Sequence, residues 1–240
     1  MAHLTDYLAQ RTYPGRGILF GKTHDGINAV AAYFIMGRSP NSRNRVLVQT
    51  SYGINTRPCD ITKVSDPSLI LYSPVRSYQD ELIVTNGDQT DTICDYLMHG
   101  GTFRSALLTR CYEPDAPNFT PRISGILHIG GGEPAYTISI LRKAAQSMDC
   151  ERAFFDYAAM SAGTGHLIHT YADNIDSLSS FEGEPLTMHL PEGNIDMFTD
   201  ALWNSLHAQN RISLFVQFLP LNGGKADTRI RNKYEFAQKE

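Results

Sequence analysis

Lysine and tryptophan are scarce in this chain of 240 residues, and charge of either sign is nearly balanced. Lysine occurs 6 times against 15 arginines, and the net charge is only -4. No strong field is therefore available to attract nucleic acid or an acidic membrane. No segment reaches the roughly 18 consecutive apolar residues of a membrane span. The sequence predicts neither a nucleic-acid partner nor a membrane partner, and any recognition of an anion must be local.

Cysteine is also infrequent, with four residues at widely separated positions, Cys59, Cys94, Cys111 and Cys150. No C-x-x-C pair is present, so the pattern favours neither a zinc knuckle nor a disulfide framework. Reduced thiols are expected. The first residues carry Asp6 and two arginines where a signal peptide needs an apolar run, which predicts a cytoplasmic location.

One domain over residues 1–240 is expected, because no low-complexity tract, charge block or linker divides the chain. Short apolar runs rich in β-forming residues, closed by Gly, Pro or Asn, predict the strands. In the first half they lie at residues 17–22, 29–37, 45–53, 68–76 and 81–87. Further strands are predicted at 122–130, 135–142, 152–159 and 211–219.

Three segments have helical periodicity instead. Residues 88–100 place Ile93, Leu97 and Met98 on one face, and residues 102–112 place Phe103, Ala106, Leu107 and Cys111 on one side. The clearest helix is expected at about 194–208, where apolar residues recur at the spacing of a core-facing stripe. Two groups of strands with helices inserted between them predict an α+β layered architecture rather than βαβ alternation.

Polar side chains are concentrated in four loops next to predicted strands, at residues 13–16, 37–45, 85–93 and 113–123. Taken singly, each has an ordinary explanation, since an N-G-D turn caps a helix and a loop arginine is solvated or salt-bridged. Together they are typical of a preformed pocket. Arginine presents a rigid fork of donors that matches phosphate or carboxylate oxygens, so the arginine bias indicates an anion site.

Other catalytic patterns are missing. There is no G-x-S-x-G or Walker-A sequence, and the glycines at 130–132 are better explained as a hairpin turn than as a dinucleotide fingerprint. His166 and His169 lie on a predicted strand, where residues three apart face opposite sides. Glu182 and Glu184 follow without completing a ligand pattern, so no metal is predicted. His128, His166 and His169 are expected to be buried, hydrogen-bonded structural residues.

Five short motifs occur in a fixed order along the first half of the chain. They are Y-x-G-R (Tyr13, Gly15, Arg16), R-S with N-R (Arg38, Ser39, Asn44, Arg45), D-P with an apolar run ending in Tyr72, N-G-x-x-T-D-T-I at 86–93, and N-x-T-P-R-I at 118–123. In this order they resemble the archaeal-type inosine monophosphate (IMP) cyclohydrolases and their bacterial homologues. The resemblance covers residues 13–125. Phe119 and residues 40–43 depart from the archaeal pattern, and the chain after about 130 looks like the bacterial branch only.

The resemblance implies a four-layer αββα sandwich similar to N-terminal-nucleophile hydrolases. It implies an enzyme of the hydrolase class that closes 5-formamidoimidazole-4-carboxamide ribotide to IMP with loss of water, in the last step of de novo purine biosynthesis. The ring closure requires no redox step, metal or cofactor. It needs a phosphate anchor, a base for the carboxamide proton and a donor for the formyl oxygen.

The matched motifs and polar loops together supply candidates for these roles. The predicted catalytic residues are Tyr72, Arg38, Glu113 and Asp115; the predicted substrate-binding residues are Arg16, Arg43, Asn44, Arg45, Asn86, Asn118 and Arg122. The arginines would clamp the phosphate or polarise the formyl oxygen, and Tyr72 would donate or relay a proton unless it is a strand aromatic. Asn86 or Asn118 would hold the carboxamide. The choice of base between Glu113 and Asp115 stays open.

Two other functions remain alternatives at this point. One is a purine-ribotide-binding protein that keeps the pocket without the reaction, because fold similarity does not fix activity. The other is an amide hydrolase of the same fold, which would need a processed terminus starting with Cys, Ser or Thr. The chain begins Met-Ala, and the strand that would carry such a nucleophile is expected to begin near Gly15 and Arg16. Both observations disfavour the amide hydrolase. Assembly into a homo-oligomer stays open.

Overall fold

The computed structural model describes residues 1–64, 71–130, 134–172 and 178–235, and every structural statement below refers to these ranges. Its strands form two sheets of seven. The first sheet has the order β1-β12-β11-β2-β3-β13-β14. Its strands are β1 (Ala2–His3), β2 (Arg16–Lys22), β3 (Asn28–Met36), β11 (Thr164–His169), β12 (Leu186–His189), β13 (Arg211–Pro220) and β14 (Asp227–Asn232). Only β1 and β12 are parallel, and the other neighbours are antiparallel.

The second sheet is antiparallel throughout and follows the sequence strand by strand, in the order β10-β9-β8-β7-β6-β5-β4. Its strands are β4 (Val46–Thr50), β5 (Gly53–Arg57), β6 (Val75–Tyr78), β7 (Glu81–Thr85), β8 (Arg122–His128), β9 (Ala135–Lys143) and β10 (Cys150–Tyr157). The contiguous block 46–157 therefore builds one sheet, whereas the first sheet joins strands from both ends of the chain.

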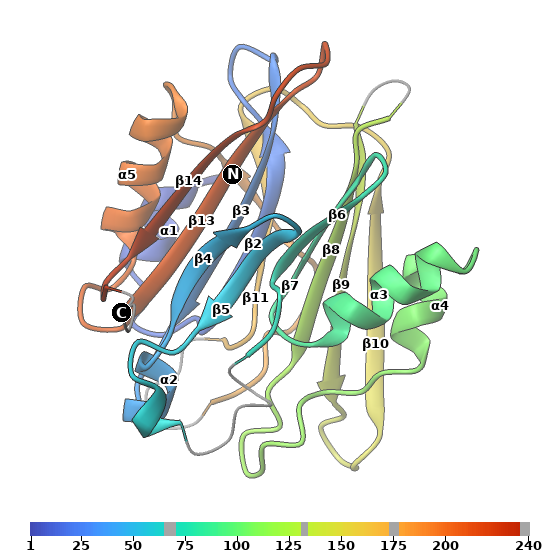
Figure 1. The fold of residues 1–240 in the computed structure, drawn as a ribbon, viewed down its shortest axis with the longest axis vertical. Coiled ribbons are helices and arrows are strands. Elements are labelled where there is room, and N and C mark those ends of the chain that lie inside the picture. Colours follow the sequence, from blue (N-terminus) through green and yellow to red (C-terminus); the bar gives the residue numbers. More distant parts are fainter. Residues whose placement is uncertain (65–70, 131–133, 173–177, 236–240) are drawn as a thin grey trace.

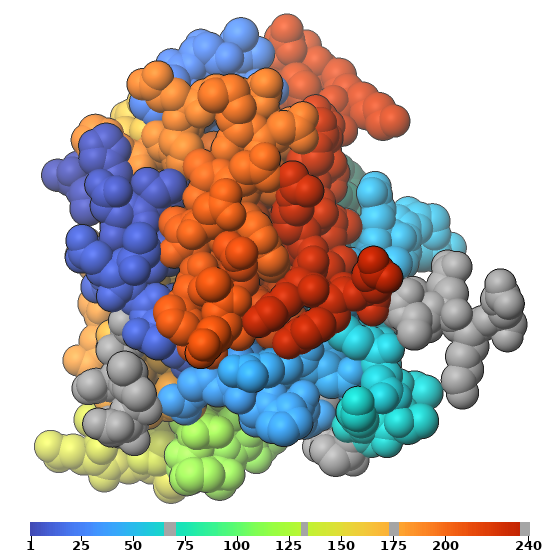
Figure 2. Space-filling view, turned by 90° about the vertical axis from the view of Figure 1, so that its left-hand side faces the viewer, coloured from blue at the N-terminus to red at the C-terminus, as the bar shows by residue number. Residues whose placement is uncertain are grey.

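Helices cover the outer face of each sheet (Figure 1). They are α1 (Leu4–Ala9), α2 (Pro40–Arg43), α3 (Gln89–Met98), α4 (Phe103–Leu108) and α5 (Ile195–Ser205), with a 3-10 turn at Ile61–Lys63. α1 and α5 lie against the first sheet, and Figure 2 shows α5 beside the N-terminal segment on that face. α3 and α4 lie against the second sheet, while α2 lies at the lower end in Figure 1.

Three apolar clusters hold these layers together. Ile18 and Phe20 of β2 point between the two sheets, whereas Leu19 points outward to the helices α1 and α5. This alternation is the period of two of a strand, and because both faces are buried the strand has a continuous apolar sequence. A third cluster packs Ile93 and Leu107 of α3 and α4 onto the second sheet.

The predicted α+β class is confirmed, but the two strand groups of the sequence do not correspond to the two sheets. The hairpin of β2 and β3 is inserted between β11 and β13 from the distant C-terminal half. Pairing over such separations depends on packing of both sheet faces, and no local pattern encodes it. Within the described part of the chain, no helix is long and apolar enough to cross a membrane.

Several predicted elements need correction. The strand expected at 68–76 falls partly outside the described residues, and its described part is a loop up to Pro74, with β6 starting at Val75. Because proline has no N–H to donate to a strand ladder, Pro74 does not continue the strand, which starts directly after it. α3 buries Ile93 and Cys94 and exposes Met98, and α4 ends before Cys111, which is exposed.

Candidate functional site

A cavity of about 290 Å³ opens at the end of the molecule where α2 lies, between β2, α2 and the loop leading into β8. Three of the four polar loops found in the sequence contribute to it. Its lining residues are Tyr13, Arg16, Met36, Arg38, Ser39, Asn41, Ser42, Arg45, Glu113, Asp115, Asn118, Thr120, Tyr171 and Leu178. Six of these were predicted as site residues: Arg16, Arg38, Arg45, Glu113, Asp115 and Asn118.

Arg16 is positioned by the turn that precedes β2. Gly15 has a φ of +82°, and a Cβ atom there would lie 2.1 Å from Thr170 Oγ1, so only glycine fits. The backbone N–H of Arg16 donates to the same Thr170 Oγ1 at 3.1 Å. This close approach of the turn to the segment after β11 holds the Arg16 side chain at the buried floor of the cavity.

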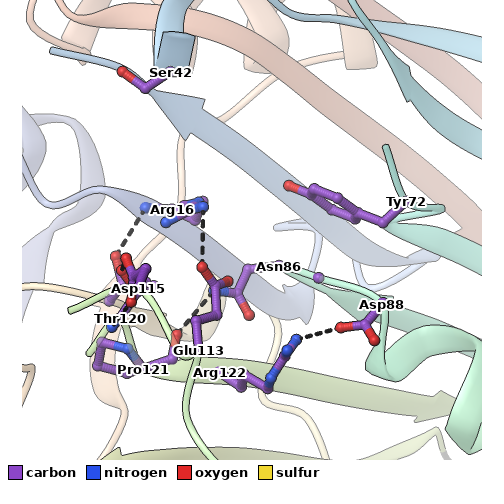
Figure 3. A network of polar contacts seen from close by, with 12 residues as sticks. Arg16, Ser42, Tyr72, Asn86, Asp88, Glu113, Asp115, Thr120, Pro121 and Arg122 are labelled. Carbon is purple, nitrogen blue, oxygen red and sulfur yellow. Dashed lines mark hydrogen bonds and ion pairs between the residues drawn. The ribbon is translucent and has the colours of Figure 1, made fainter. Parts of the chain in front are cut away.

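Arg16 and Glu113 form a buried ion pair, with Nη2 and Oε2 3.7 Å apart (Figure 3). Burial lowers the pKa of the Arg16 guanidinium, but Glu113 and the neighbouring tyrosines outweigh this and raise it. Burial raises the pKa of the Glu113 carboxyl, which Arg16 and nearby arginines counter in part. A carboxyl whose pKa is raised holds a proton more readily and is suited to accept and return one.

Asp115 lies in the same loop but its carboxylate is already occupied. The N–H of Thr120 donates to Oδ1 at 2.7 Å, and the Thr120 hydroxyl donates to Oδ2 at 2.5 Å. Because that hydroxyl has a single proton, the Tyr171 phenol must donate to Thr120 Oγ1, 2.6 Å away. Asp115 therefore holds the loop together, and Glu113 carries fewer competing hydrogen bonds.

Tyr72 lies in the loop before β6, not at the end of a strand as the sequence indicated. Its backbone N–H donates to Thr56 Oγ1 at 2.9 Å, and its carbonyl accepts from the Thr56 N–H at 2.9 Å. The phenol is buried, 2.8 Å from the Tyr33 hydroxyl, and points toward Arg16 in Figure 3. Tyr72 is thus not among the described residues that line the cavity, but its phenol faces Arg16, which lines it.

The arginines around α2 divide into two groups. Arg38 is exposed at the cavity, with its guanidinium 4.7 Å from the centre of the Tyr13 ring, and Arg45 is buried in the cavity wall. Arg43 does not line the cavity, and its Nε donates instead to the Gly37 carbonyl at 3.1 Å. Among the described residues, Arg45 Nη1 and Arg16 Nε have no hydrogen-bond partner. Buried donors without a partner are unusual and are suited to bind an anion.

Three other predicted binding residues, Asn44, Asn86 and Arg122, do not line the cavity and contact other parts of the protein instead. The Asn44 side chain pairs with the backbone of Asp60: it donates to the carbonyl at 2.7 Å and accepts from the N–H at 2.8 Å. Asn86 accepts from the Ile123 N–H at 2.9 Å and donates to the Pro121 carbonyl. For both, the structure differs from the predicted substrate contact, because their amides pair with backbone groups of distant loops.

Arg122 likewise faces protein groups. Its Nη1 lies 2.6 Å from the Asp88 carboxylate and 2.7 Å from Gln89 Oε1, and Figure 3 shows the contact with Asp88. Burial tends to raise the pKa of Asp88, but Arg110 and Arg122 outweigh it and lower it. Asn118, in contrast, is exposed at the rim of the cavity.

Tyr13 and Tyr171 were not among the predicted site residues although both line the cavity. Their rings stack with centroids 5.9 Å apart. Burial raises the pKa of Tyr171 to about 12, so the phenol stays protonated. Tyr13 belongs to the Y-x-G-R motif and could have been found from it, whereas nothing local in the sequence marks Tyr171.

The histidines only partly match their predicted roles. His169 is buried and structural: its Nδ1 donates to the Tyr171 carbonyl at 2.8 Å, and its Nε2 pairs with the Tyr7 hydroxyl at 2.8 Å. His166 is half-buried and contacts the Tyr136 hydroxyl. His128 is exposed beside Glu81, contrary to prediction, because it is the last residue of β8, where the strand reaches solvent. No group of three or more metal-ligating side chains occurs within the described ranges.

The fold and this cavity together define an α+β protein with a preformed site walled by arginines, carboxylates and tyrosines. Residues 13–223 match the family model described as IMP cyclohydrolase-like protein, and the chain belongs to this family. A relative named IMP cyclohydrolase from Methanococcus maripaludis (strain C7) is 37% identical over 120 residues, covering 48% of this chain and 58% of its own length. One from Methanopyrus kandleri is 32% identical over 165 residues, covering 67% and 76%.

A third relative named IMP cyclohydrolase, from Methanosphaera stadtmanae, is 35% identical over 124 residues, which are 50% of this chain and 59% of the relative. The chain thus spans less than two thirds of the length of the Methanococcus relative, at 58%. The family match extends through residue 223, well beyond the residues 13–125 that carry the motif resemblance.

Proposed function

We propose that this protein is an IMP cyclohydrolase, which closes 5-formamidoimidazole-4-carboxamide ribotide to IMP and releases water. The observation that carries the proposal is the buried pair of Arg16 and Glu113 at the floor of an arginine-walled cavity. A cation and a base held side by side suit a reaction in which an amide proton leaves while negative charge grows on a nearby oxygen.

The ribotide phosphate is assigned to the α2 side of the cavity. Arg38 is exposed at the opening and Arg45 has an unpartnered Nη1 in the wall. Two guanidinium groups from one loop match a phosphate with several oxygens better than lysine would. Arg43 is left out of this assignment because it donates to the Gly37 carbonyl.

Glu113 is the proposed base. It is nearly fully buried, and burial raises its pKa, whereas both oxygens of Asp115 already accept from Thr120. Glu113 would take the proton of the carboxamide nitrogen as that nitrogen attacks the formyl carbon. Asp115 would then keep the loop in place.

Arg16 and Tyr72 are proposed to stabilise the formyl oxygen as it becomes negatively charged. Arg16 Nε has no hydrogen-bond partner among the described residues, and the Tyr72 phenol shares a hydrogen bond with Tyr33. A proton from Tyr72 would help the oxygen leave as water, and Tyr33 would hold the phenol in position. Asn118 at the rim is the proposed contact for the carboxamide.

The layered arrangement is further proposed to be the αββα sandwich of N-terminal-nucleophile hydrolases. Its support is the order of helices, two facing sheets and helices through the molecule. In an amide hydrolase of this fold the nucleophile would begin this strand, whereas β2 begins with Arg16, which disfavours that alternative. A role in purine biosynthesis fits the cytoplasmic location proposed from the sequence.

The test is to mix purified, chelator-treated protein with the formamido ribotide and follow ultraviolet absorbance for IMP, with an enzyme-free control. Rapid formation that requires no added metal is expected. Ribotide binding without any rate above the control would contradict the proposal and favour a purine-ribotide-binding protein. Release of ammonia from a simple amide substrate, together with a processed terminus, would favour the amide hydrolase.

A further inference from the structure

The outermost strand of the second sheet, β10, is a long edge that no strand of the described ranges covers. It has eight residues and stands at one end of the order β10-β9-β8-β7-β6-β5-β4. All of its residues are exposed or half-buried. An uncovered edge presents backbone donors and acceptors on which another strand can pair.

The other sheet edges are protected in ways that β10 is not. β1 has two residues, and in β4 the backbone N–H and carbonyl of Leu47 each pair with the Asn232 side chain at 2.9 Å. β14 carries Arg229 and Arg231, which form ion pairs with α5. Short strands, paired backbone groups and charges are the usual means of preventing edge pairing. The middle of β10 is instead the apolar run 153–155.

The backbone of β10 presents every second residue to this open edge. The Ala144 N–H donates to the Asp149 carbonyl at 2.9 Å, and the register of β9 and β10 continues from that pair. Hydrogen-bonded pairs alternate with non-hydrogen-bonded pairs in an antiparallel ladder. The N–H and carbonyl groups of Arg152, Phe154 and Asp156 therefore face away from β9.

The side chains of these same residues share one face of the sheet. Phe155 packs in the cluster between the two sheets, whereas Phe154 packs in the cluster with α3 and α4, where the Arg104 guanidinium lies 4.2 Å from its ring centre. Because side chains alternate along a strand, Arg152 and Asp156 lie on the helix side with Phe154. This face carries a positive, an apolar and a negative side chain, in that order.

Both charged side chains are exposed to solvent. Arg152 donates to backbone carbonyls, that of Cys150 at 3.2 Å among them, and has no carboxylate partner within the described ranges. Asp156 accepts from the Thr137 hydroxyl at 2.7 Å and lies 3.4 Å from the Arg104 guanidinium in an exposed pair. Exposed pairs of this kind contribute little in water, so Asp156 is open to a further cation.

We propose that two copies of this chain associate through β10, with the two strands antiparallel about a twofold axis at Phe154. Arg152 of each copy then lies opposite Asp156 of the other, and the two Phe154 side chains meet at the axis. The residues that face the open edge exchange backbone hydrogen bonds across it, because they form the hydrogen-bonded pairs of the new ladder. The second sheet thereby continues from one copy into the next.

The order of charges selects both this register and a second copy as the occupant. An axis at Arg152 or Asp156 would place each of these residues opposite itself, which is repulsive. An axis at Ala153 or Phe155 would place Phe154 opposite a charged side chain. With the axis at Phe154, β10 is its own complement, as a twofold interface requires. A strand from another protein would have to carry the same charges in reverse.

Sedimentation equilibrium of the full-length protein and of three variants tests the proposal. Wild type is expected to be a dimer or an assembly of dimers. Arg152→Glu should weaken the association by about tenfold or more, because both cross-strand pairs become repulsive, and Arg152→Glu with Asp156→Arg should restore it. Arg57→Glu is the control, since Arg57 is exposed on β5 of the same sheet, and should associate like wild type. A monomeric wild type, or equal association in Arg152→Glu and Arg57→Glu, would overturn the proposal.

Hydrogen exchange of the associated wild-type protein decides the question if a variant fails to fold. The amides of Arg152, Phe154 and Asp156 should be protected as well as those of Ala153 and Phe155, which face β9 within one copy. Fast exchange at the first three amides in an associated protein would place the interface elsewhere and overturn the proposal. The result is independent of the proposed enzymatic activity, because neither measurement uses the ribotide.

Discussion

Arg16 Nη2 lies 3.7 Å from Glu113 Oε2, and both side chains are buried where β2 begins and the loop before β8 passes. The pair joins the first sheet to a loop of the second. Each partner offsets the free energy needed to bury the other's charge, because a buried ion without a partner strongly destabilises the folded state. The same pair is the centre of the proposed active site, so changes to it test both chemistry and folding.

The Glu113→Gln variant should lower turnover by about 10²–10⁴-fold, the range that loss of a general base gives. Steady-state kinetics with the formamido ribotide measure it. Asp115→Asn is the comparison, and we expect it to act mainly on stability, because the Asp115 carboxylate accepts from Thr120. Normal turnover in Glu113→Gln would remove this carboxylate from the mechanism.

The pH dependence of wild-type activity should report Glu113. Burial raises the pKa of this carboxyl, and a base acts only when ionised, so kcat/KM should rise with pH through that raised pKa. The contribution of Glu113 to folding stability changes with pH in the opposite direction. A carboxyl whose pKa is raised by folding contributes fully below its unfolded pKa and loses this contribution as pH rises through the folded pKa. A rate profile whose acid limb is unchanged in Glu113→Gln would contradict the assignment.

Arg38→Lys and Arg45→Lys should each raise the KM for the ribotide by roughly ten- to a hundredfold, since charge-assisted hydrogen bonds contribute about 1.5–3 kcal/mol. Lysine keeps the charge but lacks the fork. Arg43→Lys is the matched control from the same loop and should change KM little, because Arg43 donates to the Gly37 carbonyl. Equal effects in all three variants would indicate a general change of charge instead of a phosphate clamp.

Tyr72→Phe should lower kcat by about tenfold or more while costing only about 1 kcal/mol of stability, the net contribution of one hydrogen bond. Tyr33→Phe removes the same hydrogen bond but keeps the Tyr72 phenol, so its kcat should fall less. Kinetics and thermal unfolding of both variants provide the comparison. Undiminished kcat in Tyr72→Phe would show that the phenol takes no part.

Gly15→Ala should destabilise the protein by more than about 3 kcal/mol, because it combines a positive φ with a clash. The new Cβ would lie 2.1 Å from Thr170 Oγ1. Gly100→Ala is the control, since Gly100 has a φ of +79° with nothing within 4 Å, and should cost only about 1 kcal/mol. Urea unfolding measures both, and similar values would mean that the Thr170 contact yields easily.

Much of the scaffold follows from local pattern. The run around Phe20 predicted β2, and the stripe with Phe198 and Leu202 predicted α5, which Asn194 caps by accepting from the Met197 N–H. The five ordered motifs indicated the family that the match over residues 13–223 confirms. The arginine content of the sequence predicted an anion site, because residue type alone limits which partners a side chain can bind.

The tertiary structure decided which of these polar residues line the cavity and which bind other groups of the protein. Arg43 and Arg45 are two positions apart, yet one donates to the Gly37 carbonyl and the other lines the cavity. Asn86 looks like a ligand contact in the sequence, but its amide pairs with Pro121 and Ile123 from 35 and 37 positions away.

The sequence by itself determined the α+β class, the family and the kinds of side chain available to the site. Only the tertiary structure brought Tyr171 to Thr120, and only it put Glu113 against Arg16. The physical reason is that strand and helix periodicity are local, set by the backbone over a few residues. Burial, pKa and pairing depend instead on which distant segments the two sheets pack together.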